Sequence, residues 1–568
     1  MRNSAADERQ AFPFLERHQR LLCRAATAIA LACTGALIVG IALRRHIHID
    51  EFHNVFSIQL VGSFGHAGYA DPAELYHVLF APLARQFTTT RAMFSALRLV
   101  WGTLFLGLLA AAAWVQPFFP GPWGRMVAFI AGASWWPAWR HGAEIRHDTL
   151  LAFGLVALYQ VAWSAESERL TARSAAAAGA AAAWMQLDSH KAATLWGPAL
   201  LWIVLLQARR GRTSALHAAG YLGAGLSGGL LSGFALLALG GTLGAYFDQL
   251  AHFARYAATA ERFSALPVFE LMLRKGSVLS GCALLLIPLS LGLAVRRRLP
   301  PLLGTTAAFL AFTLLALAVN PVPYPYNLVW VTPAMLFGGL AVGRWLLERA
   351  GRLRLPLLAA SLVCCVAQFW SEMDGDEYLH RTWDVELRII EAAEALTAPS
   401  DPVFDGVGMV CTRPPATRDW LLHSVFMPEY RDGRREQVRD VIARARPPVL
   451  IGGHYRFSGL TDADRSAIAS HYIAVSNQLW VLGAHTSAGE NHVEILRAGR
   501  YLLLTPEPAP EFDGRPLADH EVLSLAAGTH LVHGAVTLAW LGPNLRELPT
   551  NLAVGTFLFA PNQLPGQL

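Results

Sequence analysis

Long apolar segments alternate with short polar ones along the first two thirds of the chain, and the alternation stops near residue 370. A helix needs roughly 17–25 mostly apolar residues to cross about 30 Å of hydrocarbon. The pattern therefore predicts a mostly α, polytopic membrane protein with about eleven transmembrane helices. The apolar windows are 21–43, 97–116, 122–139, 148–164, 172–187, 192–207, 216–240, 277–294, 301–319, 327–346 and 355–370.

The composition agrees with this class. Of the 568 residues, 54% are hydrophobic and only 15% are charged, which lies outside the range of ordinary soluble domains. The formal net charge of +5 is modest, and the arginines are scattered through the loops between apolar segments. Nucleic acid is therefore not an expected partner, and membrane topology explains the basic residues better.

Arginine placement gives the expected topology. Several arginines precede the first apolar window, so residues 1–20 are expected to form a cytoplasmic segment. Residues 21–370 form the predicted transmembrane domain, in which the arginine clusters of the short loops fall on the cytoplasmic side. An odd number of spans then places residues 371–568 outside the cytoplasm as a soluble domain.

The polar stretch 44–98 is far longer than a usual connection between packed elements. Asp50 and Glu51 follow the end of the first apolar window, where an acidic pair is costly to keep near hydrocarbon. We expect this stretch to be a large, partly helical external loop that builds an active site. Its other candidate substrate-binding residues are His53, Tyr69, Asp71 and His77.

The soluble region after residue 370 contains short apolar runs separated by helical patterns. Residues 402–404, 448–451 and 479–482 are typical of buried strands, which indicates an α/β layer. Beyond Asn491, alternating segments separated by Gly and Pro favour an all-β appendix. The prediction is thus an extracytoplasmic domain of α/β or β-rich type.

Two acidic sites fall on the predicted external side. Asp50 could act as a general base, because a partly desolvated carboxylate gains basicity. Glu144, Arg146 and Asp148 stand together where the window 148–164 begins. Asp50 and Asp148 together could hold a divalent metal on a substrate phosphate. The alternatives are a charge that marks the end of a span and an Arg–Asp pair that stabilises a helix start.

Further external residues could contact the substrate. Lys191 could neutralise a phosphate as a point charge, or extend to the interface like many lysines near helix ends. Arg255 offers another phosphate contact. Tyr324, Tyr326 and Asn327 lie among prolines in a rigid loop that could stack on a sugar, although interfacial aromatics are also common membrane anchors. The histidines at 53, 77 and 147 are secondary candidates for metal ligands.

The order and shared sidedness of these short motifs resemble the GT-C superfamily of polyprenyl-phosphate-sugar-dependent glycosyltransferases. Within it the chain is similar to the family 39 enzymes, the lipopolysaccharide-core sugar transferases, the lipid A aminoarabinose transferases and the protein O-mannosyltransferases. The matching elements are Asp50-Glu51, the segment 68–77 with Tyr69 and Asp71, Glu144-Ile145-Arg146-His147-Asp148, His190-Lys191, and Pro325-Tyr326-Asn327 with Pro333.

The resemblance implies a GT-C fold and a specific chemistry. The donor would be a polyprenyl-phosphate-linked sugar, and the acceptor a lipopolysaccharide, another glycan, a lipid or a protein. The first-loop Asp50 would be the catalytic base, while Asp148 would support the phosphate or a Mg, Mn or Zn ion. The protein would lie in the bacterial inner membrane with its C-terminal domain in the periplasm.

Two alternatives from other classes stay open at this point. A polytopic transporter or lipid flippase would also contain intramembrane acids, but it requires polar groups near the midplane and on both faces. A descendant without catalytic activity could bind glycolipid as a scaffold.

Overall fold

The computed structural model describes residues 13–61, 74–167, 170–259, 263–321, 323–376, 380–417, 427–487, 491–504, 510–518, 520–550, 552 and 558, although not every side chain within them. The chain divides into two compact units, each described here by itself. The helical unit comprises Met1–Leu43, Arg98–Leu236 and Phe253–His380, and the mixed unit comprises Arg44–Leu97, Leu237–His252 and Arg381–Leu568. Residues 44–97, which lie within the range 21–370 predicted as the transmembrane domain, therefore group with the C-terminal region.

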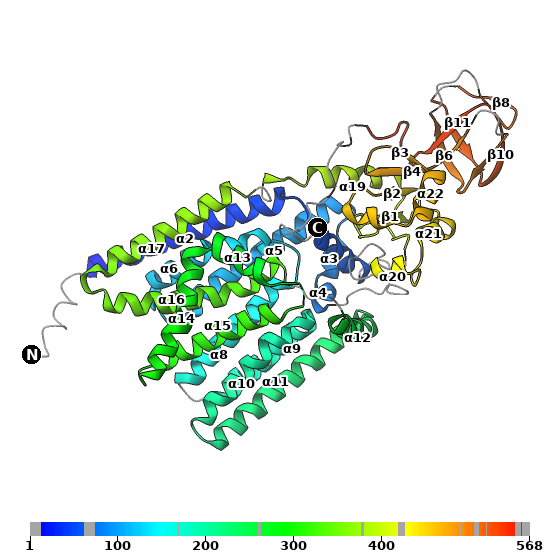
Figure 1. Cartoon of the computed structure of the whole chain (residues 1–568). Coiled ribbons are helices and arrows are strands. Elements are labelled where there is room, and N and C mark those ends of the chain that lie inside the picture. The colour runs from blue at the N-terminus through cyan, green and yellow to red at the C-terminus, as the bar shows by residue number, and fades with distance from the viewer. Residues whose placement is uncertain are drawn as a thin grey trace, which may run out of the picture. The chain divides into compact units, whose positions relative to one another are not determined.

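The helical unit consists of long helices joined by short turns (Figure 1). Some of these helices extend at one end into residues of the mixed unit. Its helices and 3₁₀ turns (η) are α2 (Pro13–Arg44), α5 (Thr90–Val115), α6 (Gly121–Ala133), α7 (Trp136–Gly142), α8 (Asp148–Ser167), α9 (Ala172–Asp188), η2 (His190–Ala192), α10 (Ala193–Ala208), α11 (Arg212–Leu239), α12 (Leu243–Thr259), α13 (Leu266–Lys275), α14 (Ser277–Val295), α15 (Pro301–Val319), η3 (Pro325–Asn327), α16 (Leu328–Arg349), η4 (Gly351–Leu353) and α17 (Arg354–Asp374).

Within the described residues, nine helices are long and apolar enough to cross a membrane. The prediction of a mostly helical, multi-pass membrane protein is confirmed, and nine of its eleven windows coincide with these helices. The window 172–187 corresponds to α9, whose 17 residues span about 25 Å at 1.5 Å per residue, less than the hydrocarbon thickness.

The window 122–139 does not form one helix. It divides into the 13-residue α6 and the short α7, with Ser134 and Trp135 outside both helices. Pro137 lies in the first turn of α7. Proline cannot donate a backbone hydrogen bond, so it suits the first turn of a helix and not its interior, which is why a new helix starts here.

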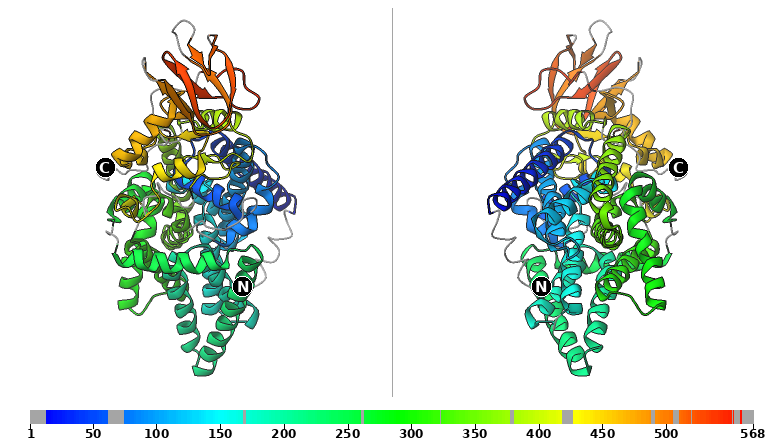
Figure 2. Two further views of the ribbon diagram at one scale, coloured as in Figure 1. Left: turned by 90° about the vertical axis from the view of Figure 1, so that its right-hand side faces the viewer. Right: turned by 90° about the vertical axis from the view of Figure 1, so that its left-hand side faces the viewer.

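Helix α16 forms the centre of the helical unit. It packs against α8, α14 and α15, and 94% of its apolar window is buried, compared with 6% for α17. Figure 2 shows the helices of this unit, coloured cyan to green, running alongside one another in two further views. A helix that is apolar all round and surrounded by others belongs in the interior of a bundle.

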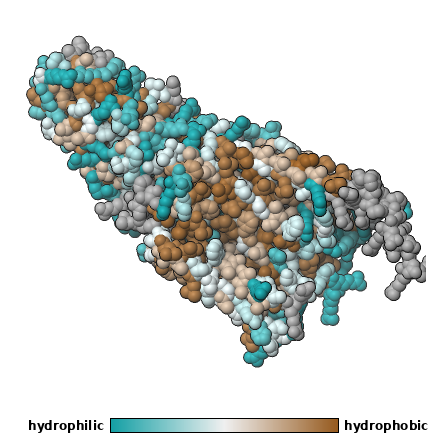
Figure 3. Space-filling view, turned by 180° about the vertical axis from the view of Figure 1, so that it is seen from behind, coloured by the Kyte–Doolittle hydropathy of each residue, from teal (hydrophilic) through white to brown (hydrophobic). Residues whose placement is uncertain are grey.

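The outer face of the helical unit is rich in apolar side chains. Figure 3 shows a broad hydrophobic surface on this unit, seen from behind. Large side chains such as Leu231, Leu291, Val295 and Leu355 are more than half exposed. A soluble monomer rarely exposes so much contiguous apolar surface, whereas a lipid-facing helix bundle does.

The mixed unit combines helices from residues 44–97 with a β-containing C-terminal region. Its main elements are α3 (Ile49–Gln59), α4 (Leu75–Ala84), α19 (Asp384–Leu396), β1 (Val403–Phe404), α20 (Met427–Arg431), α21 (Val438–Ala445), β2 (Val449–Ile451), η5 (Tyr455–Gly459), α22 (Asp462–His471), β3 (Tyr472–Ala474), β4 (Leu479–Thr486), β5 (His492–Ile495), β6 (Gly499–Leu503), β7 (Glu511–Phe512), β8 (Arg515–Pro516), β9 (Val522–Leu525), β10 (Gly528–His533) and β11 (Val536–Trp540).

The described strands form two sheets. The larger has the order β1-β2-β4-β11-β6-β9, with β3 also paired to β4, and the smaller has the order β5-β10-β7-β8. Strands β1 and β2 are parallel, and the other pairs are antiparallel. The predicted α/β or β-rich domain is confirmed. However, β11 lies between β4 and β6 in the larger sheet, so the last strands are not a wholly separate appendix.

Candidate active site

Asp148 opens α8 and is held through both carboxylate oxygens. Arg146 Nε donates to Asp148 Oδ2 at 3.1 Å, and Asn327 Nδ2 donates to Asp148 Oδ1 at 3.3 Å. All three side chains are buried in the helical unit. A buried charge is costly unless it is paired and hydrogen-bonded, and Asp148 meets both conditions.

Arg146 contributes more than a charge to this group. Its guanidinium carbon lies 3.5 Å from the centre of the Tyr326 ring, a cation–π arrangement. The indole N–H of Trp101 donates to the Arg146 carbonyl oxygen at 2.7 Å, which fixes the backbone at this position. The predicted substrate-binding residues Arg146 and Tyr326 therefore contact each other and form one buried cluster with Asp148.

The loop before α16 joins the same cluster through Asn327. Its side-chain oxygen accepts from Asn320 Nδ2 at 3.1 Å and from the Tyr324 amide at 3.0 Å. Since its side-chain nitrogen donates to Asp148, Asn327 ties this loop to the start of α8. The rings of Tyr324 and Tyr326 lie 5.3 Å apart between centres, and Tyr324 is the more exposed of the two.

Glu144 belongs to the turn between α7 and α8. Its carboxylate lies 2.8 Å from His141 Nδ1, and both side chains are buried. The neighbouring Gly142 packs so tightly that a Cβ atom there would come within 2.7 Å of the Phe105 ring. These contacts shape the turn that carries Arg146 and Asp148, and the predicted substrate contact of Glu144 stays a prediction.

Lys191 lines a pocket of the helical unit beside this cluster. The pocket encloses about 430 Å³, counting the open solvent at its mouth. Its polar side chains are His147, Ser189, Lys191, Thr194, Asn320 and Asn327, and its apolar ones are Leu151, Leu195, Ala316, Val319, Pro321 and Trp330. The pocket is thus lined by both polar and apolar side chains, which suits a ligand with a charged part and an apolar part.

Helix ends surround this pocket. Leu151, Thr194 and Trp330 belong to the first turns of α8, α10 and α16. The N-terminus of a helix carries a partial positive charge and unpaired N–H groups, so it favours an anion. Three such ends and the Lys191 ammonium therefore make the pocket a favourable place for a phosphate.

Asp50 lies in the mixed unit, in the first turn of α3. Its side chain is 27% exposed, and its Oδ2 lies 3.7 Å from His48 Nδ1. The adjacent Glu51 is fully buried, where it pairs with Arg45 and accepts the His48 amide. Of the two acids, Asp50 is therefore the one open to a substrate, while Glu51 has local contacts that cap the helix.

The other first-loop candidates have different surroundings. His53 is half-buried on α3. His77 is buried in the first turn of α4, and its Nδ1 accepts the Glu74 amide at 3.3 Å, a contact that caps this helix. Tyr69 and Asp71 lie outside the described residues.

Arg255 lies in α12, but its side chain is outside the described part of the chain. Its predicted phosphate contact stays a prediction.

The surroundings of Asp148 do not fit the predicted divalent metal. The Arg146 guanidinium already compensates its charge at 3.1 Å, and a second cation at the same carboxylate would be repelled. Among the described residues, no group of three His, Cys, Asp or Glu side chains is placed to hold a metal.

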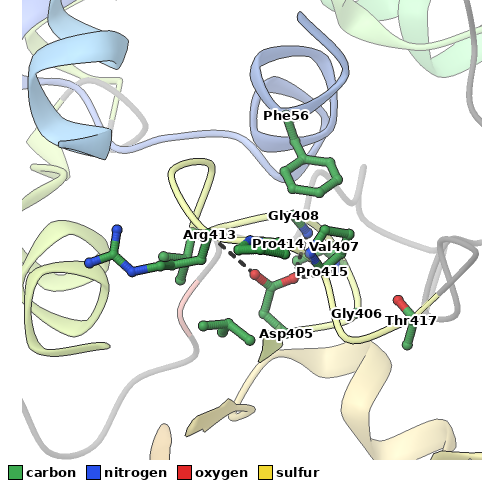
Figure 4. A pocket seen from close by; sticks show the side chains of 11 residues that line it. Phe56, Asp405, Gly406, Val407, Gly408, Arg413, Pro414, Pro415 and Thr417 are labelled. Atoms are coloured by element: carbon green, nitrogen blue, oxygen red, sulfur yellow. Dashed lines mark hydrogen bonds between the residues drawn. The ribbon is translucent and has the colours of Figure 1, made fainter. Parts of the chain in front are cut away.

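A second pocket lies in the mixed unit around Asp405, a residue that the sequence analysis missed (Figure 4). Its carboxylate accepts the amides of Val407, Gly408 and Val410, and Phe56 of α3 lines the same pocket. Burial raises the pKa of Asp405 above its ordinary value, although these amide bonds lower it. The Asp-Gly-Val-Gly sequence after β1 was the available signal, because Asp and Gly are typical of tight loops.

Comparison with known proteins supports the fold. No family model matches the chain, and no curated protein matches it in sequence. The structure is similar to that of ArnT from Cupriavidus metallidurans bound to undecaprenyl phosphate, with 12% identity, coverage of 82% of this chain and 98% of ArnT, and a TM-score of 0.55. The apo form of ArnT matches with 13% identity, the same coverage and a TM-score of 0.50.

A weaker likeness is to the oligosaccharyltransferase AglB from Archaeoglobus fulgidus, with 10% identity, coverage of 86% of this chain and 74% of AglB, and a TM-score of 0.45. The similarity to ArnT, which extends over nearly all of that protein, shows that the chain shares the overall fold of ArnT, as the resemblance of its motifs implied.

Proposed function

We propose that this chain of GT-C fold is a membrane glycosyltransferase that moves a sugar from a polyprenyl-phosphate donor to an extracytoplasmic acceptor. The observation that carries the proposal is the pocket around Lys191, which joins one ammonium group and three helix N-termini to an apolar wall. A lipid phosphate has the matching parts, an anion and a hydrocarbon chain. The similar ArnT structure contains undecaprenyl phosphate.

Lys191 is the proposed phosphate anchor. A lysine ammonium is a compact point charge that can stabilise the negative charge of a leaving phosphate. The lipid chain would lie against apolar residues such as Leu195, Val319 and Trp330. Tyr324 and Tyr326 would contact the sugar ring, and Asp148 would hold Arg146 and Asn327 in place beside them.

Asp50 is the proposed catalytic base. It would take the proton from an acceptor hydroxyl or amine, whose oxygen or nitrogen then attacks the anomeric carbon of the sugar. The bond between that carbon and the phosphate oxygen breaks, and the lipid phosphate leaves with its electron pair. A single displacement of this kind inverts the configuration at the anomeric carbon.

The acceptor class follows from the resemblance rather than from the site. It would be a lipopolysaccharide, another glycan, a lipid or a protein presented on the periplasmic side of a bacterial inner membrane. The soluble region after residue 380 would lie on that side as well. The proposal also includes donor contacts that rest on the resemblance alone, from Tyr69, Asp71, His53 and Arg255.

Reconstituted protein tests the proposal directly. Proteoliposomes are incubated with radiolabelled polyprenyl-phosphate sugars and an envelope extract that supplies acceptors. We expect label to enter the acceptor fraction with inverted anomeric configuration. Movement of intact labelled lipid across the bilayer without a new glycosidic bond would instead indicate a flippase, and bound but unreacted lipid would indicate a scaffold.

Lys191→Met tests the phosphate anchor in the same assay. Loss of a charge-assisted contact costs about 1.5–3 kcal/mol, so the KM for the donor should rise about 10- to 100-fold. The chain has two lysines, and the other, Lys275, pairs with Glu372 in the helical unit. Lys275→Met is therefore the matched control and should leave the donor KM within about twofold. An unchanged KM in Lys191→Met would remove Lys191 from the donor site.

A further inference from the structure

The chain that leads into α3 contains a small buried polar cluster. The side chains of Arg45, His48 and Glu51 are each at most 2% exposed, while Asp50 between them is 27% exposed. Arg45 Nη2 lies 3.3 Å from Glu51 Oε2, and the His48 amide donates to the same oxygen at 3.1 Å. One carboxylate oxygen thus holds both a side chain and the backbone that precede the helix.

The same cluster fixes the backbone at Asp50. His48 Nδ1 accepts the Asp50 amide at 3.2 Å, while Glu51 accepts the amide of His48. These reciprocal contacts form a cap that satisfies N–H groups left unpaired at the start of a helix. The first turn of α3 is therefore held from residue 48 to residue 51, and the direction of the Asp50 side chain is set by this turn.

A second segment of the mixed unit braces the entry to α3. The His46 amide donates to the Arg381 carbonyl at 2.8 Å, and the Trp383 amide donates to the Arg44 carbonyl at 3.1 Å. Arg45 and Thr382 form an antiparallel bridge between them. The residues just before α19 thus hold the backbone of Arg45, and with it the guanidinium that pairs with Glu51.

On the far side of the first turn, α3 is fixed by packing. The rings of Phe52 and Phe94 are fully buried and lie 4.9 Å apart between centres in an edge-to-face arrangement. With the cap on one side and this contact on the other, little freedom is left to the turn that carries Asp50.

We propose that Arg45 and Glu51 are positioning residues that hold Asp50 in its reactive orientation. This inference rests on the proposed function of Asp50. A buried ion pair contributes little net stability compared with well-packed apolar residues, so stability alone is a weak reason for this pair. Orientation is a stronger one, because a displacement of about 1 Å in a catalytic group can cost about 100-fold in rate.

Two variants separate positioning from folding. Glu51→Gln keeps an oxygen that can accept the His48 amide but loses the charge that holds Arg45. The double variant Arg45→Met, Glu51→Leu replaces the pair with apolar side chains, a change that is often neutral for stability. For both we expect kcat to fall at least tenfold while the donor KM stays within twofold. Tm should change little in the double variant, whereas Glu51→Gln leaves Arg45 buried without its counter-charge and should lower Tm, so its rates are corrected for the folded fraction.

The controls use the same chemistry elsewhere. Arg45→Lys preserves the positive charge beside Glu51, so this variant should keep most of the wild-type kcat. In the same unit, Arg91 and Glu391 form a half-exposed pair, and the double variant Arg91→Met, Glu391→Leu should keep wild-type kcat and KM. A high kcat in Arg45→Lys, together with wild-type kcat and KM in the Arg91→Met, Glu391→Leu variant, is a result that a purely structural role would not produce.

The outcomes distinguish this inference from the proposed function. If Asp50→Asn abolishes transfer but the Arg45→Met, Glu51→Leu variant keeps wild-type kcat, the positioning role is wrong and the function stands. A loss of kcat that disappears when rates are corrected for the folded fraction also overturns the positioning role. If Asp50→Asn itself keeps full activity, the proposed function fails first.

Discussion

The two carboxylates that the sequence marked as a catalytic pair have opposite surroundings. In the mixed unit, Asp50 is 27% exposed and stands in the first turn of α3, where the helix end favours negative charge. In the helical unit, Asp148 is 2% exposed, faces the Arg146 guanidinium and accepts a hydrogen bond from Asn327. One acid is open to a reactant, while the other is engaged on both oxygens.

This difference shows that the position of an acidic residue in a sequence motif does not by itself determine its chemical role. A base must lie within reach of the proton that it takes. Asp50 is 27% exposed whereas Asp148 is 2% exposed, which is why the proposed proton transfer is placed at Asp50. Asp148 holds Arg146 and Asn327 beside the Lys191 pocket.

The largest expected effect comes from Asp50→Asn. The amide cannot accept the acceptor proton, so kcat should fall about 10²- to 10⁴-fold, the usual contribution of general base catalysis. Since the side chain is partly exposed, Tm in detergent should stay close to that of the wild type. The measurement is transfer from labelled donor in proteoliposomes with parallel thermal melting. Wild-type-like activity in Asp50→Asn would show that Asp50 is not the catalytic base, and the proposed difference in role between Asp50 and Asp148 would be wrong.

Asp148→Asn should act mainly through stability. The amide can keep the contact with Asn327, but Arg146 is left buried without its counter-charge, which costs about 3–5 kcal/mol. We expect a clearly lower Tm, measured by thermal melting in detergent. The second change Arg146→Met removes the uncompensated charge and should restore much of the stability. If the double variant is stable yet more than about 100-fold less active than Arg146→Met alone, Asp148 has a catalytic role of the size expected for a base.

The smallest expected effect concerns a third carboxylate, Asp513, whose Oδ2 lies 2.7 Å from His530 Nδ1. The bond to His530 lowers the pKa of Asp513. Burial lowers the pKa of His530, but the bonds to Asp513 and to the Ala526 carbonyl raise it on balance. Because Asp513 is half exposed, His530→Ala should cost below about 1 kcal/mol and leave transfer unchanged.

The pH dependence of this pair follows from both directions. The contribution of His530 is present below about pH 6.5, its ordinary pKa, and is lost as the pH rises through its higher folded value. The contribution of Asp513 is present above its ordinary value of about 3.9 and is lost as the pH falls through its lower folded value. Melting of wild type and His530→Ala should therefore differ most between about pH 4 and 6.5. A constant difference from pH 4 to 9 would contradict the pairing.

The membrane fold was predictable because it depends on local apolar length. Nine windows coincide with helices, since roughly twenty apolar residues can satisfy both the lipid and their own backbone hydrogen bonds. The window 122–139 failed because Pro137 starts a new helix inside it. The strands of the soluble region were also found locally, but the place of β11 in the larger sheet depends on pairing with β4 and β6.

The sequence by itself determined which residues are candidates for chemistry: Asp50, Asp148, Lys191 and the Tyr-Pro-Tyr-Asn loop stand out because charged and polar groups beside apolar spans are costly. Only the tertiary structure decided what each one touches. Asn327 reaches Asp148 across 179 positions of the chain. Arg381, which begins the last segment of the mixed unit, accepts the His46 amide just before α3. Such partners are chosen by packing, which no local pattern records, and they separate an available carboxylate from an engaged one.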